Sequence, residues 1–222
     1  RSPTRRSSAL PSDATAAVGS ELGLDASEQI AGAAPAGSPR GLGLIPLTEQ
    51  VCAVGLGAPF GRIDSETLAR LAALVATYGI SEVRLSPWRT LYVAAKNFSV
   101  GSLAVFIYEL GLIVDDADPV MRVDACSGVG CCPSTALATR QHARMLAGAM
   151  ARTGFAGSLH VSGCAKGCAR SAPADVVLVG EGDSYHVVRN GTVKSAPCGM
   201  LDPAGLDLTG NGLFEANEKA HV

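Results

Sequence analysis

The alternation of apolar and polar residues first becomes regular after residue 40. The run VCAVGL (51–56) has strand character. After a capping Asp64 or Ser65, apolar residues recur at helical spacing as far as Gly79, and these are Leu68, Leu71, Leu74 and Val75. The pattern therefore predicts a strand followed by a helix.

The next stretch predicts two short strands and a second helix. The strands are SEVRLS (81–86) and TLYVAA (90–95), joined by the turn PWR, and the helix covers about 100–110 and ends at Gly111. With the preceding elements, this order predicts a small α+β unit over 41–118, whose helices cover one face of a sheet.

A second unit is predicted over 119–198, with the boundary near Pro119. Its expected elements are a Gly-punctuated cysteine loop (121–132), an Ala-rich helix (133–153), strands at 158–163 and 175–180, and a hairpin over 185–195 that turns at Asn190-Gly191. Residues 199–222 receive no assignment. Residues 1–40 are rich in Ser, Ala, Pro and Gly, and we expect a disordered linker or tail there.

Composition excludes some classes of partner. Of 222 residues 47% are apolar, enough for a sizeable core, and 18 basic against 20 acidic residues give a net charge of −2. That balance gives no general case for nucleic acid or an anionic membrane as the partner. Apolar runs are too short for a membrane span, and residues 1–40 lack the apolar segment of a secretory signal. We therefore expect a cytoplasmic protein.

Five of the seven cysteines fall between residues 126 and 168. Cys126 and Cys132 form a C-x5-C pair, and Cys164 and Cys168 form a C-x3-C pair that follows a predicted strand. In a chain with so large an apolar content, metal or redox chemistry is favoured over a disulfide framework. At helical spacing Cys164 and Cys168 would share one face of a helix. The free amides of its first turn could then donate hydrogen bonds to the sulfides of a bound iron–sulfur cluster.

An iron–sulfur cluster is the favoured ligand of these thiols, because iron takes thiolate sulfur readily. Structural zinc is the alternative, although zinc pairs are typically more closely spaced than C-x5-C. Cys131 could replace Cys132 as a ligand. Cys52 is expected in the core, and Cys198 carries no readable signal.

At this point the sequence resembles a known family. The cysteine pairs, behind an α+β unit carrying an R-x-S-x-x-R segment, look like the siroheme- and [4Fe-4S]-binding sulfite and nitrite reductase superfamily. Longer stretches are similar to its precorrin-3B synthase branch: LGLIPL (42–47), VGLGAPFGRID (54–64), VRLSPWRTLYV (83–93), DACSGVGCCPST (124–135) and LHVSGCAKGCARSAPADVVLVG (159–180).

The resemblance implies an architecture and a cofactor. It implies a ferredoxin-like half-unit followed by a sulfite reductase-like α/β unit, together equivalent to the C-terminal half of the enzyme, with a missing N-terminal half as partner. It also implies that Cys126, Cys132, Cys164 and Cys168 hold a [4Fe-4S] cluster. In the reductases the last of these cysteines, here Cys168, would bridge to siroheme.

The resemblance further implies a reaction. A synthase of this branch would convert precorrin-3A to precorrin-3B with O2 and electrons from NADH or a donor reductase, using a mononuclear non-haem iron as well. Guanidinium groups bind carboxylates bidentately, so Arg84 and Arg89 are candidates for holding the substrate's acetates and propionates, and Lys166, a cation inside the cysteine loop, is the third. His160 is weighed as an iron ligand against a hydrogen-bonded structural histidine.

Each of these residues also has an interpretation without a role in substrate binding. Arg84 could face solvent, Lys166 could only offset the cluster's charge, and Arg140, His142 and Arg144 could form a solvated helix face. Two alternative functions also stay open: a siroheme-dependent sulfite or nitrite reductase, and a non-catalytic domain stabilised by zinc or a cluster.

Overall fold

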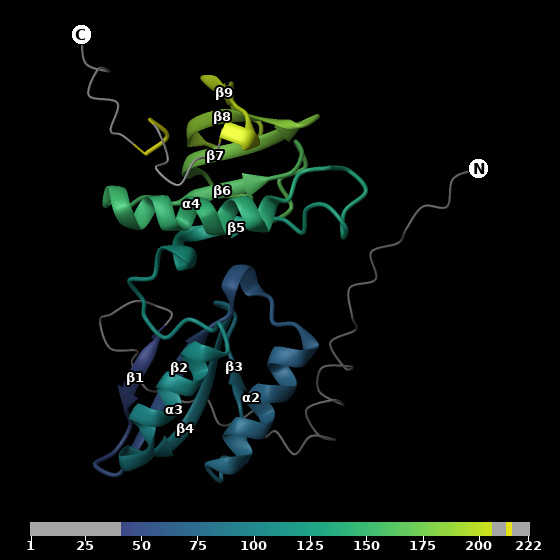
Figure 1. Cartoon of the computed structure of the whole chain (residues 1–222). Helices are drawn as coiled ribbons and strands as arrows, with labels where there is room; N and C mark the ends of the chain where they lie inside the picture. Colours follow the sequence, from purple (N-terminus) through teal and green to yellow (C-terminus); the bar gives the residue numbers. More distant parts are fainter. Residues whose placement is uncertain (1–40, 206–211, 215–222) are drawn as a thin grey trace, which may run out of the picture. The chain divides into compact units, whose positions relative to one another are not determined.

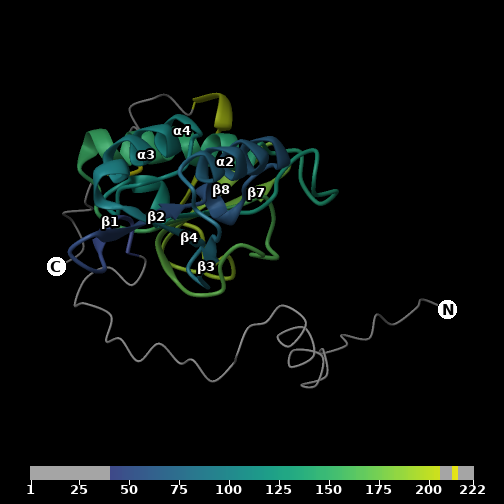
Figure 2. The same cartoon turned by 90° about the horizontal axis from the view of Figure 1, so that it is seen from below.

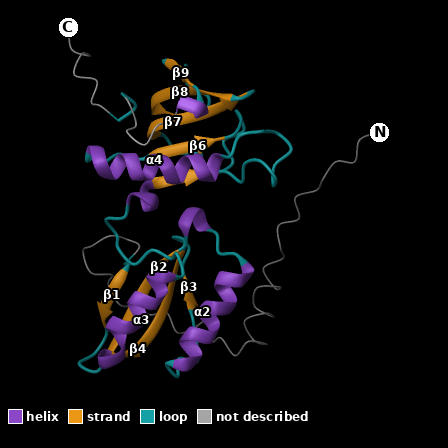
Figure 3. Cartoon of the chain, in the orientation of Figure 1, coloured by secondary structure: helices purple, strands orange, loops and turns teal. Residues whose placement is uncertain are grey.

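The computed structural model describes residues 41–205 and 212–214 (Figure 1). They form two β-sheets with separate cores, and helices accompany each sheet (Figure 3). This arrangement confirms the α+β expectation. Residues 1–40, the expected linker, lie outside the described part of the chain.

The first sheet has four antiparallel strands in the order β1-β2-β4-β3. The strands are β1 (Gly43–Pro46), β2 (Val51–Gly57), β3 (Arg84–Leu85) and β4 (Thr90–Lys96). Helices α2 (Ser65–Thr77) and α3 (Asn97–Glu109) lie on the same side of this sheet (Figure 2). One shared core of aliphatic side chains results, including Val54, Leu56, Leu71, Val93 and Ile107.

Helix α2 begins where its cap predicts. The Asp64 carboxylate accepts a hydrogen bond from the Thr67 N–H at 2.8 Å, and this bond lowers the pKa of Asp64. Leu71 and Val75 are buried, as the helical spacing predicts, whereas Leu68 is 50% exposed. The apolar stripe of α2 is thus narrower than the sequence pattern indicates.

The second sheet has the order β5-β6-β7-β8-β9. Its strands are β5 (Val123–Ala125), β6 (Leu159–Ser162), β7 (Ala174–Glu181), β8 (Ser184–Gly191) and β9 (Gly199–Leu201). The first three are parallel, and β8 and β9 add antiparallel pairs. All of β6 is buried, and β7 contains the continuous buried apolar run Val176–Val179, as is typical of strands covered on both faces.

Helix α4 (Thr139–Thr153) packs on one face of this sheet, with Ala143, Leu146 and Met150 fully or almost fully buried. It ends at Gly154, whose φ of +68° suits glycine. Part of the unassigned segment 199–222 belongs to this unit, because β9 pairs with β8 and the Phe214 ring packs 5.0 Å from that of Phe155.

Two sequence-based expectations are wrong here. The helix expected over 133–153 begins only at Thr139, because the preceding residues form turns in which the Thr135 hydroxyl accepts the Leu137 N–H at 3.0 Å. The expected hairpin at Asn190-Gly191 does not form. Strand β8 continues to Gly191, and the chain returns through a turn in which the Ser195 N–H donates to the Thr192 carbonyl, so that β9 becomes the antiparallel partner. The tight hairpin lies between β7 and β8 at Gly182-Asp183, where Gly182 has a φ of +59°.

Short 3-10 helices complete the described elements: η1 (Pro59–Gly61), η2 (Pro119–Arg122) and η3 (Pro203–Gly205). Pro119, the expected unit boundary, starts η2, which precedes β5. Within the described residues, every helix is too short or too polar to cross a membrane.

Candidate metal and carboxylate site

The two cysteine loops leave the second sheet at the same edge. Strands β5 and β6 are parallel neighbours with Ala125 opposite Val161, so their carboxyl ends lie side by side. Cys126 follows β5 directly, and Cys164 comes two residues after the end of β6. Ligand sites of open parallel sheets form at such ends.

Hydrogen bonds connect these loops. The Gly163 N–H donates to Cys126 Sγ at 3.2 Å, and the Cys126 N–H donates to the Val161 carbonyl at 3.2 Å. Further out, Lys166 Nζ donates to Ser134 Oγ at 2.9 Å. The C-x5-C and C-x3-C segments are therefore in contact, although they are far apart in sequence.

Close backbone packing explains two glycines between the loops. A Cβ at Gly163 would lie 2.6 Å from Thr135 Cγ2, and a Cβ at Gly180 would lie 2.5 Å from the Gly163 carbonyl oxygen. Real side chains do not approach so closely, so a larger residue at either position would separate the loops.

Cys126 is surrounded by polar groups of α4 and β8. The Thr139 hydroxyl donates to the Cys126 carbonyl at 2.8 Å and lies 3.6 Å from its sulfur. Tyr185 is fully buried and its hydroxyl hydrogen-bonds His142 Nδ1 at 2.8 Å. Burial, and secondarily the Cys126 charge, raise the pKa of Tyr185, whereas burial lowers the pKa of His142. His142 thus pairs internally rather than lying on a solvated face.

The vicinal cysteines differ in environment. Both backbone N–H groups donate to the Gly128 carbonyl, at 3.3 Å from Cys131 and 2.9 Å from Cys132. Cys131 is exposed and accepts a long contact of 3.9 Å from Arg62, whereas Cys132 is partly buried. The choice of ligand between them stays open.

The helical reading of Cys164 and Cys168 is wrong. Their segment consists of turns, and Gly167 has a φ of +63°, which interrupts any helix. The two sulfurs therefore do not share a helix face, and no helical first turn supplies amides there. Cys164 is partly buried and Cys168 is exposed.

No group of three or more His, Cys, Asp or Glu side chains is close enough to hold a metal ion within the described part of the chain. The cluster assignment therefore stays a prediction. The donor chemistry fits it: four thiols lie on two touching loops, and a backbone N–H donates to Cys126 Sγ, an interaction that stabilises a thiolate. Beside the loops is an open hollow lined by Ser134, Thr135, Gly163 and Gly180, among others.

The three candidate carboxylate-binding residues have different partners. Arg84 is exposed and pairs with Glu82 at 2.9 Å, and Lys166 is held by Ser134. Arg89 has a φ of +63° and forms an ion pair with Asp124 of β5, leaving 40% of its side chain exposed. None of these contacts prevents binding of an anion, and the assigned roles stay predictions.

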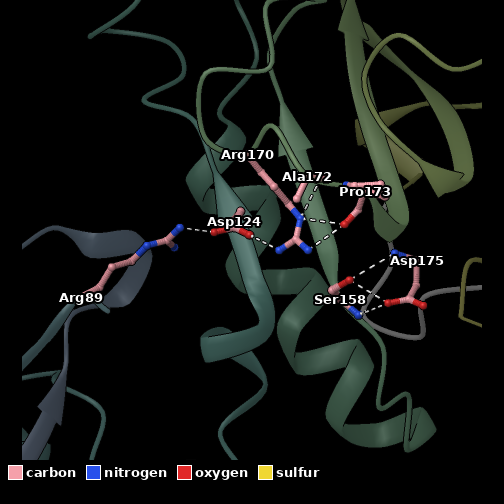
Figure 4. Close-up of polar contacts among 7 residues, drawn as sticks. All are labelled: Arg89, Asp124, Ser158, Arg170, Ala172, Pro173 and Asp175. Carbon is pink, nitrogen blue, oxygen red and sulfur yellow. Dashed lines mark hydrogen bonds and ion pairs between the residues drawn. The ribbon is translucent and has the colours of Figure 1, made fainter. Parts of the chain in front are cut away.

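Asp124 holds two arginines at once (Figure 4). Its Oδ1 faces Arg89, and its Oδ2 accepts from Arg170 Nη1 at 2.9 Å. Arg170 also donates to the carbonyls of Ala172 and Pro173 at 2.7–3.1 Å. Sequence reasoning missed both Asp124 and Arg170. The sequence analysis assigned 121–132 to a loop, and only the structure shows that Asp124 lies inside the buried strand VDA, where a charge requires partners.

His160 lies beside Asp124 in the register of β5 and β6 and is 1% exposed. Neither ring nitrogen has a hydrogen-bond partner among the described residues. It is thus not the hydrogen-bonded histidine that we weighed, and no set of metal ligands is described around it. Burial lowers its pKa, the Asp124 charge opposes this, and the Arg170 charge adds to it.

The two other polar candidates of α4 also have defined surroundings. The Arg144 guanidinium lies over the Phe60 ring, 5.6 Å from its centroid. The Nε of Arg140 is buried without a partner in the described residues.

Comparison with known proteins agrees with these features. The family model for the nitrite/sulfite reductase ferredoxin-like half domain matches residues 47–95, which contain most of the first sheet. A precorrin-3B synthase of Sinorhizobium sp. is 30% identical over 156 residues. Residues 47–95 thus carry the ferredoxin-like half domain of nitrite and sulfite reductases, and the chain is similar to members of that superfamily. This confirms the resemblance seen in the sequence and the ferredoxin-like character of the first unit.

Two mycobacterial proteins are also similar to this chain. A protein named sulfite reductase [ferredoxin] 1, of Mycolicibacterium paratuberculosis, is 28% identical over 138 residues, which are 58% of this chain and 25% of that protein. The solved NirA protein of Mycobacterium tuberculosis has the same fold, with a TM-score of 0.61 at 20% identity over 74% of this chain and 35% of that one.

The match to the precorrin-3B synthase covers 69% of this chain and 34% of the relative. The chain thus spans about a third of the length of that relative.

Proposed function

We propose that this chain contributes the cluster-bearing part of a precorrin-3B synthase-like monooxygenase, acting in the cytoplasm. The observation that carries the proposal is the 30% identity to a precorrin-3B synthase, combined with two touching cysteine loops at one sheet edge. The reaction would convert precorrin-3A to precorrin-3B with O2 and electrons that originate from NADH. An N-terminal half and an electron-donating reductase would be its partners.

In this proposal Cys126, Cys132, Cys164 and Cys168 hold a [4Fe-4S] cluster. When bound, such a cluster supplies single electrons. The protein's own part is to place the sulfurs and to donate the Gly163 N–H to Cys126 Sγ. Ligands of a mononuclear iron would come from outside the described residues or from the partner half.

The substrate would be held by its acetate and propionate groups. Arg89 suits this task because it is partly exposed and already oriented by a carboxylate, so its remaining N–H groups are free to meet another. Among the described residues Arg84 pairs with the exposed Glu82, and an exposed pair of this type contributes little free energy, so a substrate carboxylate can replace it. Lys166 lies between the cysteines and would add a cationic group.

A second candidate is a siroheme-dependent sulfite or nitrite reductase. It is favoured by the similarity to the mycobacterial sulfite reductase. In that case Cys168, which is exposed, would be the thiolate beside siroheme iron. The same loops would also serve a non-catalytic domain stabilised by metal.

Anaerobic purification followed by iron, sulfide and zinc assays and a visible spectrum separates these candidates. About four irons and four sulfides per chain without siroheme bands support the synthase. Turnover of precorrin-3A with the N-terminal half added then tests the reaction. Siroheme bands would favour the reductase, and zinc without sulfide would refute both.

A further inference from the structure

The Asp124 carboxylate lies between two positively charged groups from different parts of the chain. Arg89 comes from the turn between β3 and β4, and Arg170 comes two residues after Cys168 in the C-x3-C loop. The Asp124 side chain is 11% exposed, compared with 40% for Arg89 and 29% for Arg170. A buried carboxylate thus orients one partly exposed guanidinium and anchors a cysteine loop through another.

The direction of the Asp124 side chain follows from the strand. Val123 and Ala125 point into the core beneath α4, so Asp124 between them points to the opposite face. On that face Arg170 closes the loop by donating to Ala172 and Pro173 as well as to Asp124 (Figure 4). Each carboxylate oxygen of Asp124 thus accepts from one arginine, Oδ1 from Arg89 and Oδ2 from Arg170.

We propose that Asp124 is a positioning residue that fixes Arg89 for a substrate carboxylate and couples it, through Arg170, to the C-x3-C loop. The substrate class in this inference rests on the proposed function. Binding of a tetrapyrrole carboxylate to the outer N–H groups of Arg89 would alter the contact between Arg89 and Asp124 Oδ1. The resulting shift of Asp124 would alter the contact between its Oδ2 and Arg170, and with it the loop that carries Cys164 and Cys168.

The sign of one substitution separates positioning from simple charge. Asp124→Asn removes one negative charge from the site, so electrostatic attraction alone would tighten binding of a polyanion. Loss of the oriented guanidinium acts in the opposite direction. If Asp124 positions Arg89, binding becomes about tenfold weaker despite the loss of that negative charge, because hydrogen bonds to charged groups are among the stronger ones.

The experiment uses the full chain, purified anaerobically, with uroporphyrin as the tetrapyrrole polycarboxylate probe and its dissociation constant as the readout. Arg170→Lys is the second variant, because it keeps the positive charge but removes the planar guanidinium that donates to several acceptors at once. It also leaves Asp124 unchanged, so it can be used if Asp124→Asn does not fold. We expect it also to weaken binding, and the double variant to be no weaker than Asp124→Asn alone. Asp175→Asn is the matched control: Asp175 hydrogen-bonds Ser158 at 2.7 Å, and we expect less than a twofold change.

Hydrogen–deuterium exchange of residues 163–173 measures the coupling to the loop. Uroporphyrin should slow this exchange in the unmodified chain and leave it unchanged in Asp124→Asn, a difference that a purely structural role would not produce. Equal or tighter binding by Asp124→Asn would overturn the proposal, as would an unaltered response of the loop.

Failure of the proposed function is recognised separately. If the unmodified chain does not bind uroporphyrin, either alone or with the N-terminal half added, the tetrapyrrole assignment is wrong. Arg89→Gln then tests the coupling without a ligand. Faster exchange at 163–173 supports transmission through Asp124, and unchanged exchange refutes it.

Discussion

Gly163→Ala tests whether the two cysteine loops depend on their close approach. A Cβ at this position would lie 2.6, 2.8 and 2.9 Å from Cγ2, Oγ1 and Cβ of Thr135. Thr135 is short and branched, so it cannot swing aside as a long side chain could. The loops must move apart, and the 3.2 Å contact between the Gly163 N–H and Cys126 Sγ weakens.

The expected cost follows from this overlap. Extra methyl groups in well-packed sites typically destabilise by about 1–3 kcal/mol. For a domain of this size each kcal/mol lowers the melting temperature by about 2–4 °C, so we expect a decrease of about 2–12 °C. Thermal unfolding followed by circular dichroism measures it, and iron and sulfide assays of the same samples report whether the cysteine site is damaged as well.

Gly199→Ala is the matched control, because a Cβ there meets no atom within 4 Å. Thr135→Ala in the Gly163→Ala background removes Cγ2 and Oγ1 from the overlap and should recover part of the stability. The single Thr135→Ala variant is measured beside it, since it loses the hydrogen bond to the Leu137 N–H. Equal melting temperatures for Gly163→Ala and Gly199→Ala would refute the packing argument.

Three further predictions concern single side chains. Cys132→Ser should lose most iron and sulfide while Cys131→Ser keeps them, because Cys132 is the less exposed of the two; the reverse result would assign Cys131 as the ligand. Burial lowers the pKa of His160 below 6.5, so the unfolded state takes up a proton first and stability falls as the pH drops through that value. His160→Leu should therefore reduce the loss of unfolding free energy between about pH 7.5 and about pH 5.5, measured by urea unfolding. An unchanged dependence of that free energy on pH would exclude His160 as its source. Gly154→Ala, at a φ of +68° with no atom within 4 Å of its Cβ, should cost about 1 kcal/mol of unfolding free energy through backbone strain alone, and no change would contradict that origin.

Much of the fold was predictable because it follows from local signals. Asp64 caps α2, the apolar positions of that helix at residues 71 and 75 are buried, and Gly154 ends α4. Strands β2, β4, β6 and β7 were expected near their observed positions for the same reason, since strand periodicity depends on neighbouring residues, whereas β1, β5 and β9 were not expected. Local rules suffice where each residue's environment is set by its own element.

The errors arise where tertiary contacts override these rules. Residues 133–138 are Ala-containing and begin with Pro, which suits a helix, yet Thr135 packs against Gly163 from another loop. The spacing of Cys164 and Cys168 suggests one helical face, but Gly167 adopts a left-handed conformation with Val193 close by. In both cases the deciding partner is distant in sequence.

The arrangement around Asp124 shows which part of an ion-pair site a sequence can indicate and which part it cannot. A carboxylate between Val123 and Ala125 in a buried strand cannot be left without a partner, so its position alone demands a cation. Which cation is not a local question, because Arg89 lies 35 residues before Asp124 and Arg170 lies 46 residues after it. The resemblance to the superfamily draws attention to Arg89 as a ligand of substrate, and the structure adds that its guanidinium already shares a carboxylate with the cysteine loop. Because Arg89 and Arg170 contact the same carboxylate, the proposed coupling predicts that substitutions of Arg89 also affect the cysteine loop, and for that reason they should be assayed at the loop as well as by binding.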